Sequence, residues 1–231
     1  METARIAELL KPFLRAPIQP APDACHSEPA RAGEEPTVLS RAQLQHISTY
    51  IDILLRWNAS INLTAIRDPE EIVTRHFGES LFAARHLFPS VSSVVNDVAV
   101  ADIGSGAGFP GIPLKLWAPN IALTLIESNH KKAAFLREIA RALTLTGINI
   151  QNTRAEALGT IFDTVTLRAV ERFEAILPTA ASLVAPSGRL ALLIGSAQQD
   201  RAHSTLPGLS WSTPMPIPNS RSRILLIGHN C

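Results

Sequence analysis

The sequence predicts an α/β protein built on a mostly parallel β-sheet. Beyond residue 98, short apolar segments alternate with segments of helical periodicity, which is typical of a parallel sheet covered by helices on both faces. A cluster of glycines follows the first of these apolar segments and precedes a helix. The chain has 231 residues, 46% hydrophobic and 18% charged, which suffices for one well-filled α/β domain with a modest extension.

We divide the chain into three parts. Residues 1–36 are expected to hold a short amphipathic helix followed by a proline-rich, flexible linker. Residues 37–97 are expected to form an N-terminal helical cap, in which Ser40 begins a capping-box pattern and Asp68 begins a second helix. Residues 98–231 are expected to form the α/β domain.

The expected elements follow from the spacing of apolar residues. Helices are predicted over residues 1–15, 40–57, 68–87, 128–143 and 171–184. Strands are predicted over residues 98–103, 122–126, 148–151, 164–167, 189–194 and 223–227. The proline-rich segment 197–220 has room for at most one edge strand, because proline cannot donate to a strand ladder. The predicted sheet therefore has seven strands and a late hairpin.

Glycines recur at every second position after the first strand, in the pattern Asp102-x-Gly104-x-Gly106-x-Gly108. Without a Cβ, glycine lets the backbone turn tightly and approach a ligand closely. Residues 106–111 match the dinucleotide pattern G-x-G-x-x-G by letter. In that pattern the first glycine ends the strand directly, whereas here Gly104 already precedes Gly106, so the match lies in the wrong register.

The acid before the glycines helps to decide whether the loop binds a dinucleotide or a cofactor that carries a sulfonium cation. Asp102 suits a sulfonium cation, whereas it would repel a pyrophosphate. The loop therefore looks like motif I of the methyltransferases that use S-adenosylmethionine (SAM), and we expect their Rossmann-like fold.

Acidic residues also follow the next two strands. Glu127 comes 19 residues after Gly108, where an acid can bond the ribose hydroxyls of a cofactor. Its alternative role is a helix N-terminal charge that the helix dipole favours. Ala155 and Glu156 follow the third strand, where such proteins contact adenine, and a solvated loop residue is an equal alternative for Glu156.

The loop after the fourth strand reads Leu167-Arg168-Ala169-Val170. It lacks the Asp/Asn-Pro-Pro-aromatic tetrad of enzymes that methylate exocyclic amines. A cysteine nucleophile for pyrimidine C5 is also absent nearby, since the only cysteines are Cys25 and Cys231. No Lys-Asp-Lys-Glu set for ribose oxygens is evident. The remaining kind of target is already nucleophilic, such as guanine N7, which needs alignment but no general base.

No residue is therefore predicted to transfer protons in catalysis. Arg168 is expected to position the substrate or the cofactor. An ion pair with Asp163 or Glu171 is its alternative role.

Several segments, the glycine turn among them, carry a further resemblance. They lie in order along the chain, at residues 57–58, 62–69, 75–81, 104–114, 131–137 and 168–169. Together they resemble the RsmG (GidB) family, bacterial 16S ribosomal RNA guanine-N7 methyltransferases. The resemblance implies SAM as cofactor and, as substrate, a guanine in a conserved small-subunit loop near the decoding site. It implies cofactor contacts at Gly104, Phe109, Ala155, Glu156 and Arg168, with Glu127 beside them.

Contacts to RNA are expected ahead of the sheet. Arg67, Arg75 and His76 lie on or between the two helices of the predicted cap, and such side chains stack on bases exposed in single-stranded loops. The alternative role of Arg75 is an i,i+4 pair with Glu79, which stands where the RsmG family usually has Asp.

Composition sets the remaining expectations. The net charge of +1 is a weak electrostatic footprint for a nucleic-acid binder. Apolar runs are too short for a membrane span, and the cysteines suggest neither a disulfide framework nor a metal site. We expect a cytoplasmic monomer that binds 16S ribosomal RNA or the small ribosomal subunit, with no metal and no membrane. Two alternatives stay open: a SAM enzyme with another substrate, and a non-catalytic ribosome-binding protein.

Overall fold

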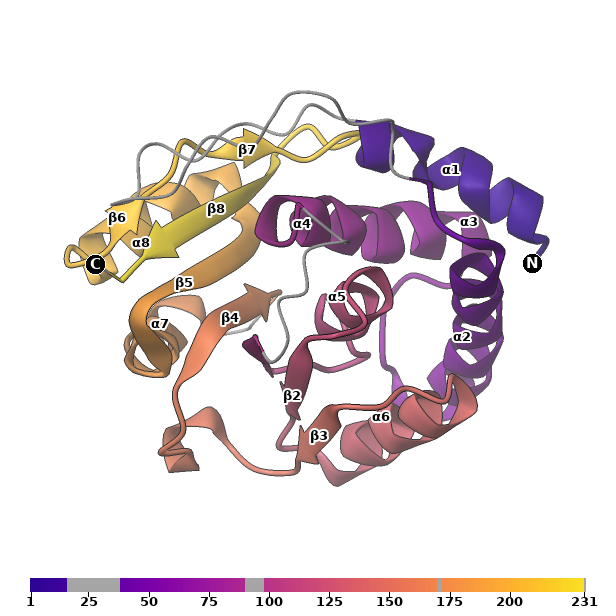
Figure 1. The fold of residues 1–231 in the computed structure, drawn as a ribbon, viewed down its shortest axis with the longest axis horizontal. Helices are drawn as coiled ribbons and strands as arrows, with labels where there is room; N and C mark the ends of the chain where they lie inside the picture. The colour runs from indigo at the N-terminus through magenta and orange to yellow at the C-terminus, as the bar shows by residue number, and fades with distance from the viewer. Residues whose placement is uncertain (16–37, 90–97, 170–171, 231) are drawn as a thin grey trace.

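One central β-sheet with helices on both faces forms the body of the molecule (Figure 1). The computed structural model describes residues 1–15, 38–89, 98–169 and 172–230. The predicted α/β fold is confirmed, although the sheet has eight strands where seven are expected. The predicted linker at residues 16–36 lies outside the described residues.

The order of the strands indicates where on the sheet a ligand binds. The strands are β1 (Ala99–Ile103), β2 (Ala122–Ile126), β3 (Ile148–Gln151), β4 (Phe162–Arg168), β5 (Val184–Gly195), β6 (Ser210–Trp211), β7 (Met215–Pro216) and β8 (Arg223–His229). They run β3-β2-β1-β4-β5-β8-β6, and β7 also pairs with β8. β1 to β5 are parallel, and β8 is antiparallel to β5. The order reverses between β1 and β4, and ligands bind beyond the carboxyl ends of strands at such a reversal.

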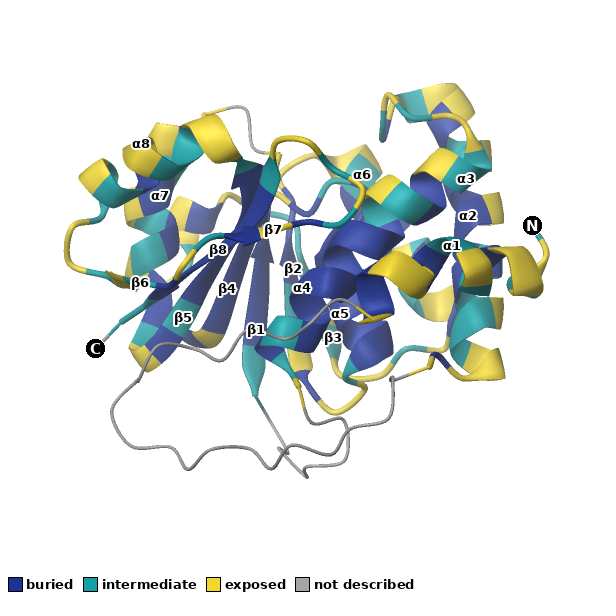
Figure 2. Cartoon of the chain, turned by 90° about the horizontal axis from the view of Figure 1, so that it is seen from above, coloured by how far each residue is buried: buried dark blue, intermediate teal, exposed yellow. Residues whose placement is uncertain are grey.

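Both faces of the sheet are buried (Figure 2). Neighbouring strand residues point to opposite faces, so Val100 packs in one hydrophobic cluster and Ala101 in the other. The first cluster includes residues of α1 (Thr3–Arg15), α2 (Arg41–Ile61), α4 (Glu79–Leu87), α5 (Gly111–Trp117) and α6 (His130–Ala142). The second includes residues of α7 (Phe173–Ser182) and α8 (Gln199–Thr205). The N-terminal helices therefore share one core with the sheet.

The predicted helix starts form the expected caps. Ser40 Oγ accepts a hydrogen bond from the Gln43 backbone N–H at 3.2 Å, and the Ser40 N–H donates to the Gln43 side chain at 2.7 Å. Asp68 accepts from the Glu71 N–H at 2.8 Å. Each side-chain cap contributes about 1 kcal/mol to helix stability. α2 continues past its expected end and stops at Asn62, which adopts the left-handed conformation.

The helix predicted over residues 68–87 changes type along its length. α3 (Pro69–Glu71) leads into a π-helix, η1 (Ile72–Gly78), and then into α4. Gly78 lets α1 pack closely, because a Cβ there would lie 2.5 Å from the ring of Phe13. π-helical turns are rare and often occur at functional sites. This one carries Arg75 and His76.

Segment 197–220 holds more structure than expected. In place of at most one edge strand, it contains α8 and the two-residue strands β6 and β7. Both strands pair with β8, at different places along it. Strands of two residues are too short to show a periodicity in the sequence. Only their pairing with β8 defines them. Pro216 sits in β7 at the sheet edge, where a missing donor is tolerated.

Two features are absent from the described residues. No described helix combines the length and hydropathy that a membrane span needs. No described group of three or more His, Cys, Asp or Glu side chains is placed to hold a metal ion.

Candidate active site

The glycine turn lies at the carboxyl end of β1. Gly104, Gly106 and Gly108 have φ angles of 66°, 55° and 83°, a region that is costly for residues with a Cβ. A Cβ on Gly108 would also lie 2.5 Å from the hydroxyl oxygen of Tyr50. The predicted turn is therefore formed, and at Gly108 both conformation and space require glycine.

Asp102 supports the turn from inside the sheet. Its Oδ1 accepts a hydrogen bond from the Thr166 hydroxyl at 2.9 Å, and its Oδ2 accepts from the Gly111 N–H at 3.3 Å. The residue is 0% exposed, and burial raises its pKa to about 6 against the opposing effect of these hydrogen bonds. The carboxylate is not among the groups that line the cavity beyond the turn, and its predicted place beside a bound cation stays a prediction. Asp102 joins β4 to the start of α5.

A cavity of about 370 Å³ opens beyond the carboxyl ends of β1, β2 and β3. Its size falls in the usual range of small-molecule sites, about 300–1,000 Å³. Gly104, Glu127, Ala155 and Glu156 line it, so four predicted residues from three segments meet in one place. The wall also holds four polar residues that were not predicted from the sequence, namely Ser128, Thr153, Arg154 and Arg172. Three of them closely follow the ends of β2 and β3, and that position is the signal that points to them.

Glu127 faces the turn through its carboxylate. Its Oε2 accepts from the Gly106 N–H at 2.9 Å, and its Oε1 accepts from the Asn129 N–H at 2.7 Å. The Asn152 side chain donates to the Glu127 carbonyl at 2.8 Å, which fixes the backbone at this point. A carboxylate has about four acceptor sites, so further hydrogen bonds to a diol remain available.

Three rings form a stack behind the turn. Phe109 lies between Tyr50, at 5.3 Å between ring centroids and 6° between planes, and His76, at 4.8 Å and 23°. The Tyr50 hydroxyl donates to the carbonyl of Ala107 within the turn. The Phe109 ring is not on the wall of the cavity, and the cofactor contact that the family resemblance implies for Phe109 stays a prediction. Its ring ties the turn to α2 and η1.

His76 is held as a neutral imidazole. Arg168 Nη2 lies 3.1 Å from Nδ1, and because a guanidinium can only donate, Nδ1 must accept. Nε2 then carries the proton and donates to Thr64 Oγ1 at 2.8 Å. Burial, and then the charges of Arg168, Arg75 and Arg223, lower the pKa of His76 to about 3. Both ring nitrogens are therefore engaged within the protein.

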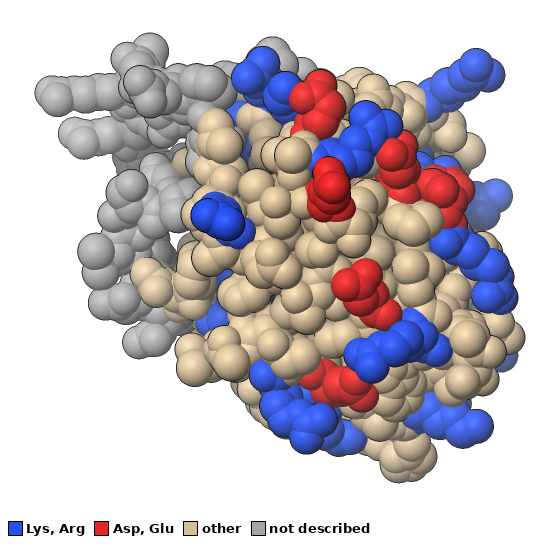
Figure 3. Space-filling model, turned by 90° about the vertical axis from the view of Figure 1, so that its right-hand side faces the viewer, with Lys and Arg blue, Asp and Glu red and all other residues tan. Residues whose placement is uncertain are grey.

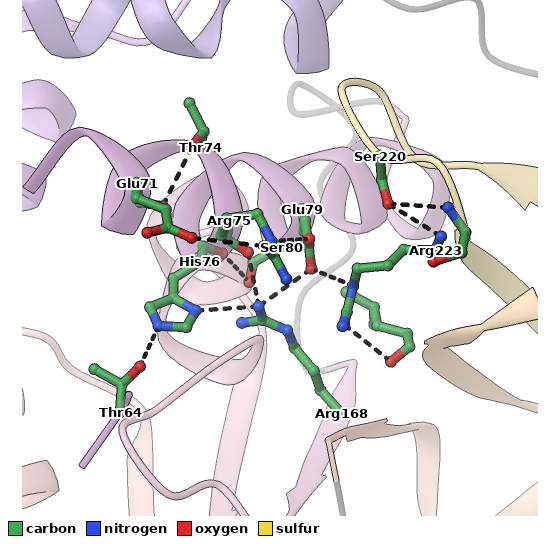
Figure 4. A network of polar contacts seen from close by, with 12 residues as sticks. Thr64, Glu71, Thr74, Arg75, His76, Glu79, Ser80, Arg168, Ser220 and Arg223 are labelled. Carbon is green, nitrogen blue, oxygen red and sulfur yellow. Dashed lines mark hydrogen bonds and ion pairs between the residues drawn. The ribbon is translucent and has the colours of Figure 1, made fainter. Parts of the chain in front are cut away.

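Three arginines converge on Glu79, which is 1% exposed (Figure 4). Arg75 Nε lies 3.2 Å from Oε1, whereas Arg168 Nη2 and Arg223 Nε lie 3.1 Å and 2.9 Å from Oε2. The alternative role of Arg75, the i,i+4 pair, is thus formed. Arg168 pairs with Glu79 and not with Asp163, which accepts from the Ala99 N–H. Glu171, its other predicted partner, lies outside the described residues.

The predicted RNA contacts differ in their surroundings. Arg67 is exposed in the loop between α2 and α3, and the Arg75 side chain is 44% exposed despite its ion pairs. His76 is stacked inside the protein. Basic and acidic side chains are interspersed on the face that Figure 3 shows, with no unbroken basic surface on it. Contact of these three residues with RNA stays a prediction.

Solved structures with a similar arrangement identify the fold. Magnesium protoporphyrin IX methyltransferase from Synechocystis PCC 6803, described with bound SAM, matches with a TM-score of 0.62 and 16% identity over 87% of this chain and all of that chain. A SAM-dependent methyltransferase from Aquifex aeolicus matches with a TM-score of 0.54 and 13% identity over 71% of this chain and 94% of that one. The fold is therefore that of the SAM-dependent methyltransferases.

Sequence comparisons identify the family within this class. The model of the family described as "GidB: rRNA small subunit methyltransferase G" matches residues 43–209. Ribosomal RNA small subunit methyltransferase G of Xylella fastidiosa (strain M23) is 40% identical over 160 residues, covering 68% of this chain and 72% of that protein. Its counterpart in Stenotrophomonas maltophilia (strain K279a) is 39% identical over 175 residues, covering 73% and 78%. The chain belongs to the rRNA small subunit methyltransferase G family, as the resemblance predicts, and is a SAM-dependent methyltransferase.

Proposed function

We propose that this protein transfers a methyl group from SAM to N7 of a guanine in 16S ribosomal RNA of the small ribosomal subunit. The observation that carries the proposal is the cavity in which the glycine turn, Glu127 and Ala155-Glu156 meet at the reversal of the sheet order. Family membership supports the class of reaction and substrate, because the curated relatives are named for the small-subunit ribosomal RNA.

The residues of the cavity fit SAM. Gly104 gives close access to the backbone, and Glu127 offers acceptors for ribose hydroxyls. Ala155 and Glu156 form the part of the wall assigned to adenine. When bound, SAM supplies an electrophilic methyl group on a sulfonium. The protein's own part is to bind the cofactor, exclude water and align the acceptor atom.

The polar groups near Arg168 favour an acceptor that has no proton to lose. The lone pair of His76 Nδ1 accepts a hydrogen bond from Arg168, and the Glu79 carboxylate forms ion pairs with three arginines. Asp102 is fully buried under the turn. None of these three is free to act as a general base, and guanine N7 needs none at neutral pH. Arg168 then acts by position and charge, since its guanidinium stays protonated with a pKa of about 10.

The expected setting is a cytoplasmic monomer that acts on the small ribosomal subunit. The proposal is tested with small subunits from cells that lack this enzyme, tritium-labelled SAM and the purified protein, followed by mapping of the labelled nucleotide. One labelled guanine at N7 is expected. Label elsewhere in the RNA refutes the N7 assignment. Absence of label with intact SAM binding favours another substrate, and absence of SAM binding favours a ribosome-binding protein.

The control for this assay is Gly104→Asp. At the φ of 66° an aspartate is strained, and its side chain fills the approach to the cavity. Calorimetry is expected to detect no SAM binding by this variant, and the small subunits should stay unlabelled. Unchanged SAM affinity would count against the glycine turn as the cofactor site.

A further inference from the structure

A second, smaller recess lies beside the main cavity. It has a volume of about 40 Å³, and its wall includes Arg168, Ala169, Gln198 and Arg223. The main cavity covers the ends of β1, β2 and β3, whereas this recess covers the ends of β4, β5 and β8, on the other side of the reversal in strand order. A donor bound over the first three strands leaves this side for the acceptor.

The wall of the recess is short of negative charge. Arg168 and Arg223 share a single oxygen atom, Oε2 of Glu79. The other oxygen of Glu79 accepts from Arg75, which also pairs with Glu71 at 3.6 Å. The neighbouring His76 is neutral and adds no charge. Two arginines of the recess wall therefore share one carboxylate oxygen, and Figure 4 shows both of them directed at Glu79.

Both guanidinium groups are also incompletely hydrogen bonded. The buried Nε of Arg223 lies 2.9 Å from Glu79 Oε2 as an ion pair but makes no hydrogen bond within the described residues. The Arg168 side chain is 7% exposed, and its buried Nε–H has no hydrogen-bond partner within the described residues. Most buried donors in proteins are paired, so an unpaired one marks a place for a ligand or an ordered water. The Arg223 side chain is 21% exposed and is reachable from solvent.

We propose that this recess binds a phosphodiester group of the RNA strand that carries the target guanine. The planar donors of arginine match phosphate oxygens in a forked geometry, so Arg168 and Arg223 are the contacts. Glu79 and Arg75 are positioning residues. Glu79 pairs with both guanidinium groups, and Arg75 pairs with the other oxygen of Glu79. The assignment rests on the proposed function, which supplies the RNA. The competing anion is the carboxylate of the cofactor.

The decisive variant is Arg223→Gln, with Arg223→Lys as the conservative change and Arg201→Gln as the matched control. Arg201 pairs with Glu174 on the exposed surface of α8. Methylation of small subunits is measured at several salt concentrations, and SAM affinity is measured by calorimetry. For Arg223→Gln, KM for small subunits should rise about 10-fold, and the salt dependence of log(kcat/KM) should fall by about one unit of slope. SAM affinity should stay within about twofold, which also shows that the variant is folded.

The controls sharpen this outcome. Arg223→Lys keeps the charge but loses the fork, so it should fall between Arg223→Gln and the wild type. Arg201→Gln should equal the wild type. A normal KM and salt slope in Arg223→Gln overturns the proposal. A loss of SAM affinity with an unchanged KM overturns it as well, and assigns the recess to the cofactor carboxylate.

A second arm needs no methyl transfer. Inorganic phosphate is titrated into the ¹⁵N-arginine-labelled protein, and the Nε–H signals are followed by NMR. The signals of Arg168 and Arg223 should shift, while that of Arg201 should not. Unmoved signals at both residues overturn the anion site. If they shift but small subunits are not methylated, the anion site stands, and both the proposed function and the RNA assignment fall.

Discussion

Glu127 and Gly106 stand 21 positions apart and are joined by a 2.9 Å hydrogen bond from the Gly106 N–H to Glu127 Oε2. This bond connects the end of β2 to the turn after β1. The acid assigned to the ribose hydroxyls thus also fixes the conformation of the glycine turn, so one side chain serves both parts of the cofactor site.

The first prediction tests this double role through Glu127→Gln. The Gly106 N–H and the Asn129 N–H donate to different oxygens of Glu127, and in the variant one of these oxygens becomes an amide NH2, so one of the two N–H groups loses its acceptor. A hydrogen bond to a charged group contributes about 1.5–3 kcal/mol, so SAM affinity should fall about 10- to 100-fold in calorimetry. Glu174→Gln, on the exposed surface of α7, is the control. Wild-type affinity in Glu127→Gln would contradict the ribose assignment.

The second prediction concerns Gly108→Ala. A methyl group there meets both the positive φ of 83° and the Tyr50 hydroxyl at 2.5 Å. Left-handed strain and overpacking together should lower the free energy of unfolding by about 2–4 kcal/mol. Urea unfolding measures the change. Gly208→Ala is the control, because a Cβ at Gly208 has no neighbour within 4 Å among the described atoms.

The third prediction concerns the buried carboxylate of Glu79. Glu79→Gln leaves three guanidinium groups around a neutral amide, and breaking a buried ion pair in this way costs about 3–5 kcal/mol of unfolding free energy. Glu174→Gln removes a surface pair with Arg201 and should cost about 0–1 kcal/mol. Equal stability of the two variants would show that the arginine cluster does not depend on Glu79.

The fourth prediction is a pH dependence at His76. Its pKa is about 3 in the folded protein and 6.5 in a free histidine, so between these values the unfolded chain binds a proton that the folded chain does not. Stability is therefore present above pH 6.5 and is lost as the pH falls through this window, by about 1.4 kcal/mol per pH unit. His76→Asn should lack this component.

The pH dependence is checked by urea unfolding of both proteins between pH 4 and 7, and by NMR of the His76 ring. The ring signals should not titrate above pH 4.5. The exposed His130 on α6 gives a control variant, His130→Gln, whose unfolding curve should follow the wild type at each pH. Titration of the His76 ring near pH 6 would contradict the tautomer assigned from the Arg168 contact.

Local patterns in the sequence predicted much of the fold. The capping pattern at Ser40, the strand before Asp102 and the alternating glycines after it each depend on a few adjacent residues, and the structure contains all three. The pairing of β6 and β7 with β8 could not be predicted from the sequence, because strands of two residues are defined by their partner. The π-helix at 72–78 was also missed, since its pattern resembles that of an α-helix.

In the candidate site, too, some residues could be predicted from the sequence and others could not. Gly104, Glu127 and Ala155-Glu156 follow strand ends, and parallel strands bring their carboxyl ends to one edge of the sheet. Arg223 had no such signal, because it begins the antiparallel β8 and reaches Glu79 only across the folded molecule. Phe109 carried a family signal for the cofactor, yet its ring packs between Tyr50 and His76.

By itself the sequence determined the parallel α/β fold, the glycine turn and the acids at the strand ends, because each is set by periodicity or by residues close in the chain. Only the tertiary structure decided that Asp102 turns inward, that His76 is neutral, and that three arginines meet one buried glutamate. Burial and charge at these positions come from segments far apart in sequence, and folding alone brings those segments together.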